Sequence, residues 1–81
     1  MFSPDEIQQA VLHAFPGSQA KVRDLTGGGD HFELLLVSSI FEGKGLVERH
    51  RMVYAALGPA VGNEIHALAL KTLTPGEAKG K

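Results

Sequence analysis

The side chains of this 81-residue chain with the most versatile chemistry are four histidines, His13, His31, His50 and His66. An imidazole can transfer a proton near neutral pH or coordinate a metal ion. The chain contains no cysteine, so it offers no thiolate for a metal, a disulfide or a nucleophilic mechanism. A closed structural zinc site needs four protein ligands and usually includes thiolates. Any metal site built on these histidines therefore needs further ligands from a second molecule.

Two of the histidines stand at the beginnings of predicted strands. His31 opens the segment HFELLLV, and His66 lies at the start of IHALALKTL. If these strands are parallel neighbours, their N-terminal ends lie at the same edge of the sheet, and adjacent strands are about 4.8 Å apart. His31 and His66 are therefore the candidate metal ligands of this chain.

A third histidine lies in a basic triplet, Arg49-His50-Arg51, within a predicted helix. Its spacing places it on one apolar stripe, formed with Leu46, Val53 and Leu57. The ordinary interpretation is a core histidine that hydrogen-bonds a backbone group. For the arginines several interpretations stay open. They form a solvated flank, they cap nearby carbonyls, or, together with Lys44, they form a docking surface for an anion, a nucleic-acid backbone or an acidic partner. His13, near the end of the first predicted helix, is expected at the surface.

No arrangement of residues indicates an enzyme. The run Gly27-Gly28-Gly29 leads into a strand and not into a helix, so it predicts a turn and not a phosphate-binding loop. Ser38 and Ser39 lack the G-x-S-x-G context of a nucleophile elbow. The acidic residues form no spaced pair suited to acid–base catalysis. We therefore expect a binding protein without catalytic activity.

Composition and charge describe one small globular domain. Hydrophobic residues make up 43% of the chain, and the net charge is −1. A protein that binds nucleic acid mainly through phosphates usually has a positive excess, so the charge argues mildly against that function. No apolar run approaches the roughly 20 residues of a membrane span, and the first residues lack the pattern of a secretory signal. We expect a soluble, cytoplasmic protein with a domain over residues 1–75 and a flexible tail over 76–81.

The hydrophobic periodicity predicts helices and strands in alternation. The first helix starts after the N-cap Ser3, and Pro16-Gly17 ends it. The further predicted elements are strands over residues 20–25 and 31–37, a helix over 46–57, a helical turn within 58–64 and a strand over 65–73. The order α-β-β-α-α-β predicts an α+β fold, a two-layer sandwich with a three-stranded mixed sheet. The last two strands should be parallel, joined by a right-handed crossover.

Several spaced motifs resemble the BolA family and span roughly residues 29–75. They are Phe41-x-Gly43, Arg49-His50-Arg51-x-Val53-Tyr54-x-x-Leu57, Ile65-His66-Ala67-Leu68 and Thr72-x-Thr74-Pro75. The resemblance implies a fold related to the type II KH domain.

The resemblance also implies a protein partner, a monothiol glutaredoxin. In such pairs the two proteins share a bridging [2Fe–2S] cluster, for which the glutaredoxin and its glutathione provide thiolates. The ligand implied on this chain is His66, and the family's second ligand lies in the loop before the second strand. That loop reads LTGGG here, as in a short-loop subgroup, which leaves His31 as the nearest candidate. Without its partner the chain would hold no cofactor, and its function would be iron–sulfur cluster trafficking or the regulation of iron or redox state.

Two alternatives remain beside this one. Some members of the family are DNA-binding regulators of stress response and cell morphology, which would use Lys44, Arg49 and Arg51 as a nucleic-acid surface. A homodimer formed through an exposed sheet edge is the third interpretation.

Overall fold

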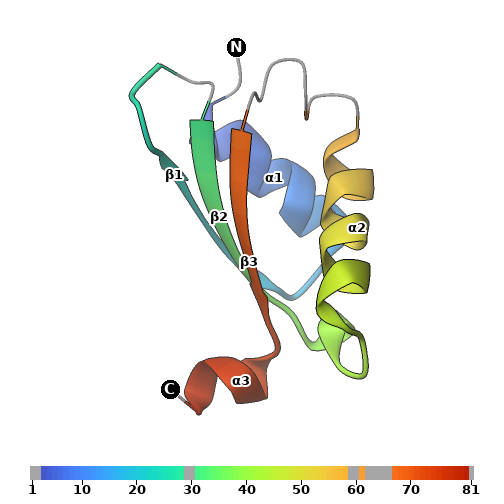
Figure 1. The fold of residues 1–81 in the computed structure, drawn as a ribbon. Coiled ribbons are helices and arrows are strands. Elements are labelled where there is room, and N and C mark those ends of the chain that lie inside the picture. Colours follow the sequence, from blue (N-terminus) through green and yellow to red (C-terminus); the bar gives the residue numbers. More distant parts are fainter. Residues whose placement is uncertain (1–2, 29–30, 59–60, 62–66, 81) are drawn as a thin grey trace.

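The computed structural model describes residues 3–28, 31–58, 61 and 67–80. Helices and strands follow one another as shown in Figure 1. In chain order they are α1 (Pro4–Ala14), β1 (Gln19–Asp24), β2 (His31–Val37), the 3-10 helix η1 (Ser39–Phe41), α2 (Leu46–Leu57), β3 (Ala67–Leu73) and α3 (Pro75–Lys79).

The three strands form one mixed sheet in the order β1-β2-β3. β1 and β2 are antiparallel, and β2 and β3 are parallel, as the sequence predicts. The parallel pair is possible because α2 returns the chain to the same end of the sheet. The predicted helical turn after α2 falls mostly on residues outside the described part of the chain.

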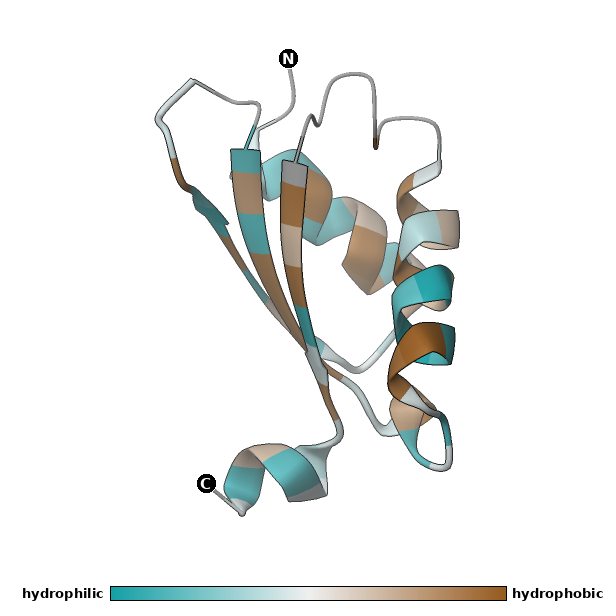
Figure 2. Ribbon diagram, in the orientation of Figure 1, coloured by the Kyte–Doolittle hydropathy of each residue, from teal (hydrophilic) through white to brown (hydrophobic). Residues whose placement is uncertain are grey.

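The core lies between one face of the sheet and the helices α1 and α2 (Figure 1). Alternation along β2 directs Phe32, Leu34 and Leu36 to this face, and all three are 0% exposed. The helices contribute the buried side chains Ile7, Val11, Val53 and Leu57. Figure 2 shows brown, hydrophobic segments on the strands and on both helices. The fold is therefore the predicted two-layer α+β sandwich, and the implied KH-like relationship is compatible with it but stays a prediction.

The start of α1 follows local sequence rules. The Ser3 hydroxyl accepts a hydrogen bond from the Glu6 amide at 3.2 Å, and the Glu6 carboxylate accepts one from the Ser3 amide at 2.8 Å. This capping box satisfies two amides that a helix N-terminus would otherwise leave unpaired. The expected N-cap at Ser3 is thus confirmed.

The C-terminal segment, predicted as a flexible tail over residues 76–81, contains a helix. Residues 75–79 form the short helix α3, because Thr74 and Glu77 make a second capping box and Pro75 occupies the first turn. The expectation of low order in this segment overlooked the Thr-x-x-Glu pattern, whereas its flexibility stays a prediction. No helix within the described part of the chain has the length and apolar character needed to cross a membrane.

Candidate functional site

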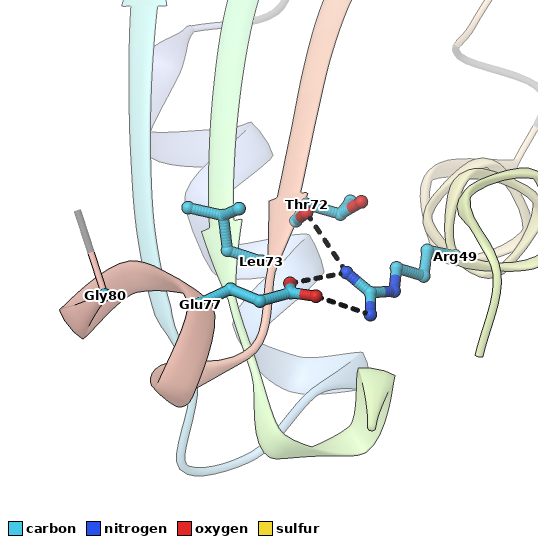
Figure 3. Close-up of a pocket in the computed structure, with 5 residues that line it drawn as sticks. All are labelled: Arg49, Thr72, Leu73, Glu77 and Gly80. Atoms are coloured by element: carbon cyan, nitrogen blue, oxygen red, sulfur yellow. Dashed lines mark hydrogen bonds and ion pairs between the residues drawn. The ribbon is translucent and has the colours of Figure 1, made fainter. Parts of the chain in front are cut away.

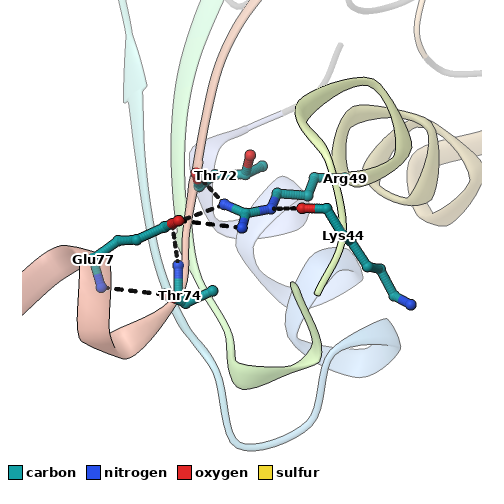
Figure 4. Close-up of polar contacts among 5 residues, drawn as sticks. All are labelled: Lys44, Arg49, Thr72, Thr74 and Glu77. Atoms are coloured by element: carbon teal, nitrogen blue, oxygen red, sulfur yellow. Dashed lines mark hydrogen bonds and ion pairs between the residues drawn. The ribbon is translucent and has the colours of Figure 1, made fainter. Parts of the chain in front are cut away.

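The most connected polar side chain of the described structure is that of Arg49, on the first turn of α2. Its Nε donates to the Lys44 carbonyl at 2.8 Å, and its Nη1 donates to the Thr72 carbonyl at 3.4 Å. Nη1 and Nη2 also donate to Oε1 and Oε2 of Glu77 at 2.8 and 3.3 Å (Figure 4). One guanidinium thus joins the loop before α2, the end of β3 and α3.

The Thr72 carbonyl lies at the open edge of the sheet. The neighbouring Leu73 carbonyl accepts a hydrogen bond from the Ser38 amide at 2.9 Å and therefore points toward β2. Carbonyls alternate in direction along a strand, so that of Thr72 points away from β2. Arg49 supplies a donor to a carbonyl for which the sheet has no further strand.

The guanidinium also packs on an aromatic ring. Its central carbon lies 5.8 Å from the centroid of the Phe41 ring, within the range of a cation–π contact. Phe41 is 0% exposed, and its ring meets that of Phe15 at 5.4 Å with an interplanar angle of 54°. The arginine is therefore anchored to the hydrophobic core by a ring, and only 12% of its side chain is exposed.

The ion pair with Arg49 lowers the pKa of Glu77. The hydrogen bonds from Arg49, and secondly that from the Thr74 amide, lower the pKa of this carboxyl from 4.5 to about 2. Glu77 in turn raises the pKa of Arg49. Glu77 is therefore ionised over the whole physiological pH range, and its charge is available to Arg49.

A cavity of about 480 Å³ opens beside the ion pair (Figure 3). It is lined by Arg49, Thr72, Leu73, Glu77 and Gly80. Sequence reasoning identified Arg49 but missed Glu77 and Thr72 as its partners. The Thr74-Pro75-Gly76-Glu77 pattern predicts a capping box and could have revealed the helix, whereas nothing local predicts the contact with Arg49.

The three basic residues predicted to form one partner surface differ in their surroundings. Arg49 is hydrogen-bonded to Lys44, Thr72 and Glu77. Lys44 is half-buried, and its Nζ lies 3.9 Å from a carboxylate oxygen of Glu48. Arg51 is exposed on α2. Exposed apolar side chains lie nearby on the same helix, Val47 at 66% and Tyr54 at 41%. A surface centred on Arg51 would thus be more apolar than the sequence suggested.

The end of the sheet at which His31 and His66 were predicted to meet, which we call the histidine edge, is described only in part. The parallel pairing of β2 and β3 places His31 opposite Ala67, the residue that follows His66 in the chain. This confirms the predicted adjacency of the two strand starts, whereas His66 itself lies outside the described residues. The Nδ1 atom of His31 is buried.

Of the other two histidines, His13 matches its expected position fully and His50 only in part. His50 is half-buried on the stripe with the buried residues Val53 and Leu57. Its Nε2 is buried without a hydrogen-bond partner in the described part of the chain, so this nitrogen does not make the predicted backbone bond. Leu46, assigned to the same stripe, is 63% exposed because the first turn of α2 extends beyond α1 (Figure 1). His13 is exposed, as expected.

The glycine-rich segment is a turn at its described end. Oδ1 of Asp24 accepts from the amides of Thr26 and Gly27 at 3.2 and 2.9 Å, and Gly27 has a φ of 80°. The Leu25 amide donates to the His31 carbonyl at 2.8 Å, which extends the hairpin into the loop. These contacts support the turn interpretation, while Gly29 lies outside the described residues.

Comparisons with known proteins agree on one family. The family model described as BolA-like protein matches residues 5–77. The chain is 42% identical over 72 residues to Protein BOLA2 of Arabidopsis thaliana, a match covering 88% of this chain and 76% of that protein. It is 43% identical over 54 residues to the DNA-binding transcriptional regulator BolA of Escherichia coli (strain K12), covering 67% and 51% of the two chains. The fold is similar to that of a bol-like protein from Babesia bovis, with a TM-score of 0.84, 37% identity and coverage of 100% and 96%.

Proposed function

This chain belongs to the BolA-like protein family, and from that membership we propose that it is a non-catalytic partner of a monothiol glutaredoxin. In this proposal the two proteins share a bridging [2Fe–2S] cluster, and the pair takes part in iron–sulfur cluster trafficking or in the regulation of iron or redox state. His66 is the proposed ligand, and His31 is the candidate for a second one.

The observation that carries the proposal is the parallel pairing of β2 with β3. It brings His31 opposite Ala67, directly after His66 in the chain. The two strand starts thus lie at the same end of the sheet, and His66 directly precedes one of them in the chain, which fits a site completed there by a second protein. The chain contributes no thiolate, so a glutaredoxin cysteine and glutathione would supply the sulfur ligands.

In the proposed pair, the metal lies between the two proteins and its ligands come from both of them. Among the described residues, no group of three His, Asp or Glu side chains is placed to hold a metal ion. When bound, a cluster with histidine ligands has a higher reduction potential than one held by thiolates alone.

The test is co-purification with a monothiol glutaredoxin and glutathione, followed by visible absorption and circular dichroism spectra. We expect a coloured heterodimer whose spectrum changes in His66→Ala and, to a smaller extent, in His31→Ala. His13→Ala is the matched control, because it removes an exposed histidine from α1. A spectrum that is the same for wild type and His66→Ala would refute the ligand assignment. Failure of the wild type to form the complex would refute the proposed function itself.

A DNA-binding function is the second candidate, and the relative named as a DNA-binding transcriptional regulator favours it. The exposed Arg51 and the half-buried Lys44 would contact phosphates. We expect a duplex to bind with an affinity that falls with salt, and Arg51→Ala to weaken it. Arg49→Ala is a poor probe, since it also removes the contacts to β3 and α3. No binding at low salt would exclude this function.

A further inference from the structure

We propose that Arg49 is a carboxylate-binding site that Glu77 occupies from within the chain, and that an acidic side chain of a partner protein binds there after α3 moves away. Glu77 then acts as an internal competitor of the partner's carboxylate. The histidine edge takes no part in this contact. The proposal can therefore fail without affecting the proposed cluster ligands, and the reverse is also true.

The guanidinium is positioned by contacts that do not involve α3. Its Nε donates to the Lys44 carbonyl at 2.8 Å and its Nη1 to the Thr72 carbonyl at 3.4 Å. The Phe41 ring supports it from the core at 5.8 Å. The donors that meet Glu77 would thus stay in place after Glu77 leaves, as a preorganised fork.

The helix that carries Glu77 is attached far more weakly. α3 has five residues, none of which is buried, and the Glu77 side chain is 46% exposed. A helix of this length is unstable by itself and depends on its tertiary contacts. The hydrogen bonds of Glu77 with Arg49 join this helix to α2. Figure 4 shows the Glu77 side chain of α3 meeting Arg49 of α2 through these bonds.

The geometry of the present occupant indicates a carboxylate as the ligand. The two Nη atoms each meet a different oxygen of Glu77, the bidentate arrangement that suits a planar carboxylate. The cavity beside the pair is lined by a single basic residue, Arg49, with Thr72, Leu73, Glu77 and Gly80 around it. A nucleic-acid backbone is usually met by several cations, and the net charge of this chain is −1. An aspartate or glutamate of a partner protein fits these features better than a phosphodiester.

Displacement of Glu77 would leave the guanidinium charge without its carboxylate. A second ion pair, between Lys44 and Glu48, spans 3.9 Å and lies at the start of the same helix. The Glu48 side chain is 63% exposed and is paired with Lys44 of the loop that precedes α2. The freed Arg49 would therefore attract an external carboxylate into the cavity shown in Figure 3.

The test uses the full chain and sodium acetate as the probe, with sodium chloride at equal ionic strength as the reference. The shift of the Arg49 Nε–Hε signal in NMR spectra reports binding. We expect Glu77→Gln to bind acetate about tenfold more tightly than wild type. This is the gain in apparent affinity if Glu77 occupies the Arg49 site in about nine of ten wild-type molecules. This substitution keeps the capping pattern, since glutamine also serves at the third helical position of a capping box.

Two further variants make the result specific. Glu48→Gln removes the same charge beside Lys44 and is expected to leave acetate binding at the wild-type level. Gly76→Ala strengthens α3, because its Cβ would meet only Oγ1 of Thr74 at 3.9 Å, and should weaken binding by about fivefold. Equal gains in Glu48→Gln and Glu77→Gln would overturn the proposal in favour of a general charge effect. It would also be overturned if Glu77→Gln bound no acetate, if wild type bound it equally well, or if inorganic phosphate were strongly preferred.

Discussion

Acid titration of Glu77 tests the contact between α2 and α3 directly. The pKa of this carboxyl is about 2 in the folded protein, against 4.5 as its ordinary value. A carboxyl whose pKa is lowered by folding stabilises the fold above its ordinary pKa, and this contribution is lost as the pH falls through the folded value. The contribution of Glu77 is therefore complete above about pH 4.5 and declines from there to about pH 2.

The assay is the carboxyl carbon shift of Glu77, followed by NMR from about pH 7 to below the folded pKa, with the Val53 methyl signals as reporters of the intact core. We expect a midpoint at about pH 2. The signals of Thr74 and Ala78 should shift together with it, because their amides belong to the capped turn of α3. A midpoint near 4.5 would mean that the bidentate contact does not exist in solution.

The variant Arg49→Ala separates the two causes of the lowered pKa. It removes the larger one, whereas the Thr74 amide still donates to the carboxylate at 2.9 Å. The midpoint of Glu77 should therefore rise but stay below 4.5. Glu48→Gln is the control for the nearby Lys44–Glu48 pair and should not move it. An unchanged midpoint in Arg49→Ala would refute the assigned cause.

Three further predictions concern stability, measured by urea or thermal unfolding. Phe41→Ala should cost about 3 to 5 kcal/mol, because it removes a fully buried ring that contacts Phe15 and Arg49; a loss below about 1 kcal/mol, typical of a surface substitution, would contradict this packing. His50→Leu should be neutral or stabilising, since the buried Nε2 has no partner in the described part of the chain; strong destabilisation would show that it has one. Gly43→Ala should cost about 1 to 2 kcal/mol, because φ is 79° and the Cβ would find open space, so that only backbone strain acts; an unchanged midpoint would argue against the positive φ.

Much of the fold could be predicted because it follows from local patterns. β2 over residues 31–37 and α2 over residues 46–57 have the predicted bounds. Alternation of apolar side chains indicated the first, and helical spacing between Gly45 and Gly58 indicated the second. β1 lies one residue earlier than predicted, over residues 19–24, since strand ends depend on the pairing with β2. The exposure of Leu46 could not be predicted, because periodicity does not say how far a helix extends beyond the layer that covers it.

For the candidate sites, the sequence by itself determined the residue types and the order of the elements. The absence of cysteine excludes a thiolate ligand from this chain, and the order of the elements predicted that the two candidate strand starts are neighbours. Only the tertiary structure decided that Arg49 turns toward Glu77, 28 residues away, and not toward solvent. The physical reason is that this contact depends on where α2 lies beside the edge of β3 and where the chain turns at Thr74. No periodicity or motif links two residues so far apart, whereas the fold brings their charged groups to 2.8 Å.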